Sequence, residues 1–122
     1  MNEQQLDRYL QIESEVEGVN SRKYKKTTRK IYKRYVLKFA KIIIENNIPI
    51  SSIRNIKTLH LKAYGEIEVW KKGRRISVVI AELQGVIHYY NTLNLSVARY
   101  RRQHLLDLRI LKNYLEGRND KI

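Results

Sequence analysis

The amino-acid sequence predicts an all-α fold, a compact bundle of about five helices. In several stretches apolar residues recur every three or four positions, which is the helical period, and no useful length of strand alternation interrupts them. Glycine occurs five times and proline once, as expected for helices joined by short loops. A chain of 122 residues with 43% hydrophobic residues is most simply one domain with a core of its own.

The first expected helix covers residues 1–17. Its short apolar stripe consists of Leu6, Tyr9, Leu10 and Val16. The segment is acidic, with five carboxylates against Arg8 alone. We interpret residues 1–20 as an acidic helix or arm, which either packs on its own basic neighbour or docks on another protomer. The remainder divides into a helical domain at 21–117 and a polar tail, or the start of a linker, at 118–122.

The second expected helix, residues 22–46, organises the rest of the chain. It holds ten basic residues and no acidic one between Arg22 and Lys41. Its apolar residues fit one helical stripe, and its cations, including Lys38 and Lys41, fall mostly on the other sides. Asn47 and Pro49 end it, because the residue before a proline avoids helical angles. A helix with an apolar side and an uninterrupted cationic side indicates a polyanionic partner.

The later elements follow from capping and periodicity. We expect the isoleucines of the 48–56 loop to fill the core. A helix at 58–72 is expected to bury a stripe of Leu59, Ala63, Ile67 and Trp70, which Tyr64 widens, and Gly73 ends it. Ser77 is expected to cap a helix at 78–93, with Gly85 on its small and polar side. Ser96 is expected to cap the last helix, 97–116, which Gly117 ends.

Composition excludes several classes of function. The chain has no cysteine, so thiolate chemistry and disulfides are absent. No apolar run approaches the ~18 residues of a membrane span, and the polar N-terminus does not resemble a signal peptide. We therefore expect a cytoplasmic, nucleoid-associated protein. Its three histidines lie far apart, so no metal site is expected. No cofactor and no small-molecule substrate are expected either. The net charge of +13 favours DNA, RNA or an acidic protein as partner.

Three runs of the chain together form a pattern: TTRKIYKRYVLKFAKIIIENN, IKTLHLKAYGEIEVWKKGRR and ISVVIAELQGVIHYYNTLNLS. Its features are Thr27, Thr28, Tyr35, Phe39, Tyr64, Gly73, Ser77, Tyr89 and Tyr90. The pattern resembles the N-terminal core-binding domain of tyrosine recombinases and phage integrases, a SAM-like domain, in a Cre-like layout. The resemblance covers residues 20–95 best.

The resemblance implies a DNA-binding role in DNA integration and recombination within a phage or mobile element. A core-binding domain forms half of a clamp on a recombination half-site, and its terminal helices contact other protomers on the double-stranded DNA. The matching positions here are Lys25, Lys26, Arg29, Lys30, Lys33, Arg74, Arg75, Ser77, Gln84 and His88. Lysine and arginine would contact phosphates, whereas Gln84 and Arg75 are the candidates for base edges.

Catalysis is not expected from this chain. The family needs a second domain with an Arg-His-Arg cluster and a nucleophilic tyrosine, and the sequence stops before one. Arg102, His104, Arg109 and Tyr114 occur in a tempting order, but their spacing departs from the H-x-x-R motif. Two alternatives remain open: a small phage- or plasmid-type accessory protein that acts through protein contacts, and an RNA-binding helical module.

Overall fold

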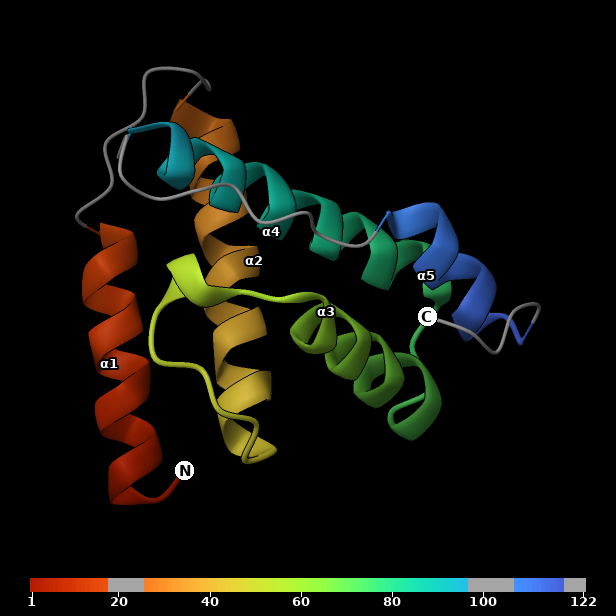
Figure 1. Cartoon of the computed structure of the whole chain (residues 1–122), viewed down its shortest axis with the longest axis horizontal. Coiled ribbons are helices and arrows are strands. Elements are labelled where there is room, and N and C mark those ends of the chain that lie inside the picture. Colours follow the sequence, from red (N-terminus) through yellow and green to blue (C-terminus); the bar gives the residue numbers. More distant parts are fainter. Residues whose placement is uncertain (18–25, 97–106, 118–122) are drawn as a thin grey trace.

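The computed structural model describes residues 1–17, 26–96 and 107–117, except for the side chains of residues 26, 27, 29 and 92–96. This part of the chain contains five α-helices and no strand, which confirms the all-α prediction (Figure 1). The helices are α1 (Glu3–Glu17), α2 (Lys26–Glu45), α3 (Thr58–Gly65), α4 (Ile76–Ser96) and α5 (Leu108–Leu115). A 3₁₀ turn, η1 (Ile53–Asn55), precedes α3, and a π-helical turn, η2 (Glu66–Lys71), follows it.

Helices α2 and α4 cross at the centre of the molecule and form most of its core (Figure 1). Val36, Phe39 and Ile43 of α2 are fully buried, as is Leu83 of α4. The loop isoleucines Ile50, Ile53 and Ile56 are at most 4% exposed, which confirms that the loop fills the core. Helix α5 packs on α4, α3 and η2.

Gly85 allows the close approach of α2 and α4. A Cβ atom built at this position would lie 2.6 Å from Cδ2 of Tyr35 and 3.2 Å from Cδ1 of Tyr32. The expectation that Gly85 belongs to a separate polar side of its helix is therefore wrong. It is a buried contact point, because only a residue without a side chain fits against the two tyrosine rings.

Helix α1 packs against α2 and η1 (Figure 1). Its buried residues are Ile12 and Val16, and the Tyr89 hydroxyl donates a 2.8 Å hydrogen bond to the Val16 carbonyl. Burial raises the pKa of Tyr89 to about 12. The expected apolar stripe was partly wrong, because Leu6 and Leu10 are exposed and Ile12 takes their place in the core.

The buried side of the third helix also differs from the expected stripe. Leu59 is 52% exposed and Trp70 is 53% exposed. Tyr64 is 1% exposed, which confirms its place in the stripe, and His60, Leu61 and Glu68 are buried with it. Trp70 stacks on Tyr114, with ring centroids 5.1 Å apart, and its Nε1–H donates to the Leu115 carbonyl at 3.1 Å. It fastens η2 to α5 at the surface rather than anchoring the core.

One predicted helix cap was wrong and two predicted helix ends are confirmed. Helix α4 begins at Ile76, so Ser77 lies inside its first turn and does not cap it. Ser96, the expected cap of the last helix, is the last residue of α4. Asp107 caps α5, and its carboxylate accepts the Arg109 backbone N–H at 2.8 Å. Residues 97–106 of the expected last helix lie outside the described residues. Gly73 and Gly117 follow their helices with φ of 73° and 77°, the left-handed conformation that favours glycine.

Among the helices of the described chain, none is both long and apolar enough to cross a membrane.

Candidate nucleic-acid interface

The cations of α2 line a groove that runs between α2 and α1. The groove has a volume of about 570 Å³ and is open to solvent. We call it the basic groove; its lining residues are Tyr9, Glu17, Lys30, Lys33, Arg34, Leu37, Lys38 and Lys41. Five of these eight are cations of α2, at Lys30 and 3, 4, 8 and 11 residues after it, so the helical period places them along one side.

Two of the five groove cations have an ion-pair partner: Lys33 with Glu17, and Lys38 with Glu82 of α4, outside the groove. Its one acidic residue is Glu17, whose carboxylate lies 3.6 Å from the Lys33 ammonium. The Glu17 side chain is 63% exposed, and such surface pairs contribute little. Lys30, Arg34 and Lys41 are exposed, and none of them has an ion-pair partner among the residues that the structure describes. Three full positive charges therefore face solvent along one helix.

The row of cations on α2 is long enough to follow the sugar–phosphate backbone of a DNA duplex over several base pairs. At a rise of 1.5 Å per residue, the distance along α2 from Lys30 to Lys41 is about 16 Å. Base pairs in duplex DNA rise by about 3.4 Å each, so the row spans roughly five of them. Apart from the Tyr9 hydroxyl, the lining offers no neutral polar side chain that would read a base edge. The chemistry of the groove suits a phosphodiester backbone.

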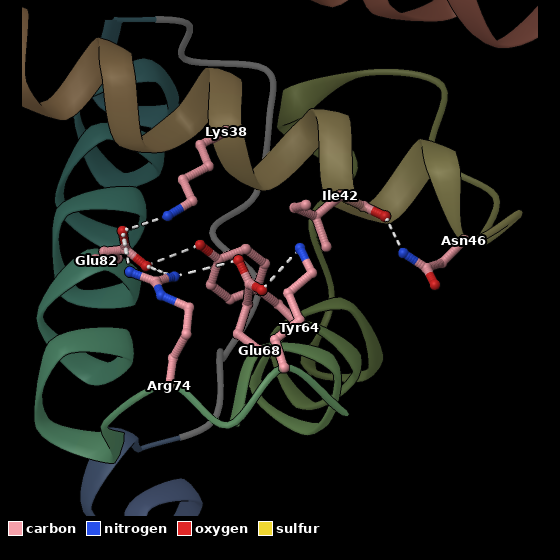
Figure 2. A network of polar contacts seen from close by, with 8 residues as sticks. Lys38, Ile42, Asn46, Tyr64, Glu68, Arg74 and Glu82 are labelled. Atoms are coloured by element: carbon pink, nitrogen blue, oxygen red, sulfur yellow. Dashed lines mark hydrogen bonds and ion pairs between the residues drawn. The ribbon is translucent and has the colours of Figure 1, made fainter. Parts of the chain in front are cut away.

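Arg74, predicted as a DNA contact, lies in an internal network of polar groups (Figure 2). Its guanidinium donates to both carboxylate oxygens of Glu82, at 2.8 and 3.1 Å, and to Glu68 at 3.2 Å. Lys38 reaches the same Glu82 carboxylate from α2 at 3.0 Å, and the Tyr64 hydroxyl donates to it at 2.9 Å. The network joins α2, α3, η2 and α4, so Arg74 holds the helices together.

The network explains why two carboxylates are tolerated in the interior. Glu82 is 7% exposed and Glu68 only 1%. Burial acts to raise the pKa of Glu82, but the hydrogen bonds from Arg74, Lys38 and Tyr64 outweigh it and hold that pKa below its ordinary value. A further cation, Lys72, lies 3.0 Å from Glu68. Each buried negative charge is therefore matched by cations.

The other predicted site residues fall into three groups. Lys30 and Lys33 line the basic groove. Arg75, directly before α4, and Ser77 and Gln84 of α4 are exposed. The His88 ring is partly buried and stacks on Tyr32 with centroids 5.8 Å apart. Lys25 lies outside the described residues, as do the side chains of Lys26 and Arg29.

The predicted site omitted three groove residues: Arg34, Lys38 and Lys41. A sequence signal for them existed, because they continue the spacing of Lys30 and Lys33 along the same helix side. The prediction stopped at Lys33 because it followed the resemblance to core-binding domains instead of the helical period.

The chain matches no protein-family model, and no curated protein and no solved structure is significantly similar to it.

Proposed function

We propose that this protein binds duplex DNA by placing a phosphodiester backbone along the basic groove. The observation that carries the proposal is the row of exposed, uncompensated cations at Lys30, Arg34 and Lys41. Contacts of this kind give affinity that depends little on sequence, because every phosphate is alike.

The resemblance to core-binding domains supports a narrower form of the proposal. In that form the DNA is a recombination or attachment half-site, gripped by a domain of an integrase. Arg75, Ser77 and Gln84 are exposed, so their side chains are accessible for base contacts. Arg74 is left out of this interface because its guanidinium already binds two carboxylates.

The test is a charge-neutralising variant of the groove, Lys30→Gln/Arg34→Gln/Lys41→Gln. All three side chains are exposed, so the fold should be unaffected. Losing three phosphate contacts at roughly 1 kcal/mol each should weaken duplex binding by about 100-fold. Fluorescence anisotropy with a labelled duplex measures this change, and circular dichroism checks the helix content.

A matched control removes the same charge elsewhere. Lys71→Gln/Arg109→Gln/Lys112→Gln changes three exposed cations of η2 and α5, outside the basic groove. We expect this control to bind within about threefold of the wild type, since its cations lie outside the groove and act on DNA only at long range. Arg109 and Lys112 also lose surface ion pairs with Asp107 and Glu116, which contribute little to stability. Equal weakening in both variants would show that the net charge alone attracts DNA, and the assigned groove would then be wrong.

Comparing the affinities for three ligands distinguishes non-specific DNA binding, binding to a recombination half-site and RNA binding. A random duplex, the duplex that flanks the gene and a structured RNA would be titrated side by side. Tighter binding to the flanking duplex favours a half-site, and tighter binding to RNA favours an RNA-binding module. No binding to any of the three at physiological salt would overturn nucleic-acid binding and favour an acidic protein partner.

A further inference from the structure

A second cavity, of about 530 Å³, shares no residue with the basic groove. It lies where α1, the loop after α2 and the start of α3 meet, and we call it the loop cavity. Its lining residues are Arg8, Pro49, Ile50, Ser51, Asn55, Lys57 and His60. Nothing in the proposed binding of DNA to α2 uses it.

The polar groups of the loop cavity favour an anion. Arg8 and Lys57 are exposed, and neither has an ion-pair partner within the described ranges. No acidic side chain lines the cavity, although α1 is rich in carboxylates. The Ser51 Oγ accepts the Asn55 amide at 2.9 Å, which leaves the hydroxyl proton of Ser51 available to a ligand.

The walls of the loop cavity are held in place before any ligand binds. His60 is 3% exposed, and its Nδ1 accepts the Lys57 backbone N–H at 2.9 Å. Its Nε2–H then donates to the Pro49 carbonyl at 2.8 Å, which ties the loop to α3. Ser52 ties the same loop to α1, because its hydroxyl donates to the Glu15 carboxylate at 2.6 Å. A binding site that is already ordered loses less entropy when its ligand arrives.

We infer that the loop cavity binds a phosphate group. A guanidinium, an ammonium and a hydroxyl are the donors that phosphate recognition uses, and two uncompensated positive charges match a phosphate dianion. The volume is in the range of small-molecule sites, and Pro49 and Ile50 give it an apolar part. A phosphate that carries a nucleoside-sized group fits this chemistry, either as a free nucleotide or as part of a nucleic acid.

The experiment is an NMR titration of the uniformly ¹⁵N-labelled chain at constant ionic strength. The probes are inorganic phosphate, adenosine monophosphate and a short duplex DNA, with chloride as the ionic reference. We expect saturable shifts of the backbone amides of Ser51, Asn55 and Lys57. The variant Arg8→Gln/Lys57→Gln should weaken this binding at least tenfold, whereas Lys71→Gln/Lys112→Gln, with the same loss of charge, should not.

The outcomes are distinct. Shifts with phosphate or adenosine monophosphate that the Arg8→Gln/Lys57→Gln variant loses would support a site for a free phosphorylated ligand. Shifts with duplex DNA alone, lost in the same variant, would support contacts to nucleic-acid phosphates. The groove variant at Lys30, Arg34 and Lys41 should keep the response to phosphate. Phosphate binding by the loop cavity can therefore be refuted without refuting DNA binding by the basic groove, and the reverse also holds. No saturable shift with any probe, or equal shifts in the variant and its control, would overturn the inference.

Discussion

Glu82 is the central acceptor of the buried polar network. Its carboxylate receives hydrogen bonds from Arg74, Lys38 and Tyr64, which come from three separate segments. Burying an unpaired charge is costly, but a buried charge with several donors is tolerated. Removing the carboxylate therefore leaves its cations without their partner.

At neutral pH we expect Glu82→Gln to lower the free energy of unfolding by about 3 kcal/mol, the usual cost of breaking a buried ion pair. The folded state lowers the pKa of Glu82. This stabilisation is therefore fully present above the ordinary glutamate pKa of about 4.3 and is lost as the pH falls through the folded pKa. Urea unfolding from pH 7 to pH 3 should show the wild type and the variant converging in acid.

Tyr64→Phe is the control for this prediction. It removes one hydrogen bond from a neutral hydroxyl to the ionised Glu82 carboxylate but keeps the cations, so it should cost only about 1.5 kcal/mol. A Glu82→Gln variant that is no less stable than Tyr64→Phe would contradict the assigned role of the ion pair.

At the scale of elements, the crossing of α2 and α4 decides how the helices pack. Gly85 brings the backbone of α4 against the rings of Tyr35 and Tyr32. The crossing also sets the polar network, since Lys38 of α2 reaches Glu82 of α4 there. A change in the spacing between the helices would therefore disturb packing and charge pairing together.

We expect Gly85→Ala to destabilise the protein by about 1–3 kcal/mol, because the added methyl group overlaps the Tyr35 ring. At an exposed helix position the same change would raise the free energy of unfolding by about 1 kcal/mol. A decrease at Gly85 would therefore indicate the close contact. Thermal or urea unfolding measures the change.

A Tyr35→Ala background provides the matching control. Without the ring, Gly85→Ala should become neutral or stabilising, and the double-mutant cycle should give a coupling above about 1 kcal/mol. Additive effects of the two substitutions would argue against a direct contact at the crossing.

At the scale of the whole molecule, charge is divided between neighbouring helices. Helix α1 has five carboxylates and one arginine, whereas α2 has no acidic residue before Glu45. The two helices pack together, yet among the side chains that the structure describes they share one ion pair, Lys33 with Glu17. Lys38 pairs with Glu82 of α4, so three of the five described cations of α2, Lys30, Arg34 and Lys41, are available to an external polyanion.

The salt dependence of DNA binding should reflect the number of unpaired cations on α2 that contact phosphates. If about six phosphates are neutralised, the logarithm of the association constant should fall with the logarithm of salt concentration at a slope of about −5. Removing the cations at Lys30, Arg34 and Lys41 should reduce the magnitude of that slope by about 3. Anisotropy titrations between 50 and 200 mM salt would measure both slopes. An unchanged slope in the variant would contradict phosphate contacts by these residues.

The sequence by itself determined the helical class, the run of cations on α2 and the helix ends at Gly73 and Gly117. It also predicted correctly that Ile50, Ile53 and Ile56 fill the core. These features are local: helical period, left-handed glycines and apolar loop residues depend on nearby positions in the chain. The cationic row on α2 was visible for the same reason.

Only the tertiary structure decided which residues are buried where segments meet. Trp70 is exposed and Glu68 is buried, the reverse of what their hydrophobicity favours. Trp70 stacks on Tyr114 of α5, and Arg74, which pairs with Glu68, is also bound by Glu82 of α4. Gly85 is a point of close contact only because the rings of Tyr35 and Tyr32 in α2 pack against it. The loop cavity combines Arg8 of α1 with Lys57, a pairing that no local pattern contains. Burial of charge and close packing depend on partners that only the folded chain brings together.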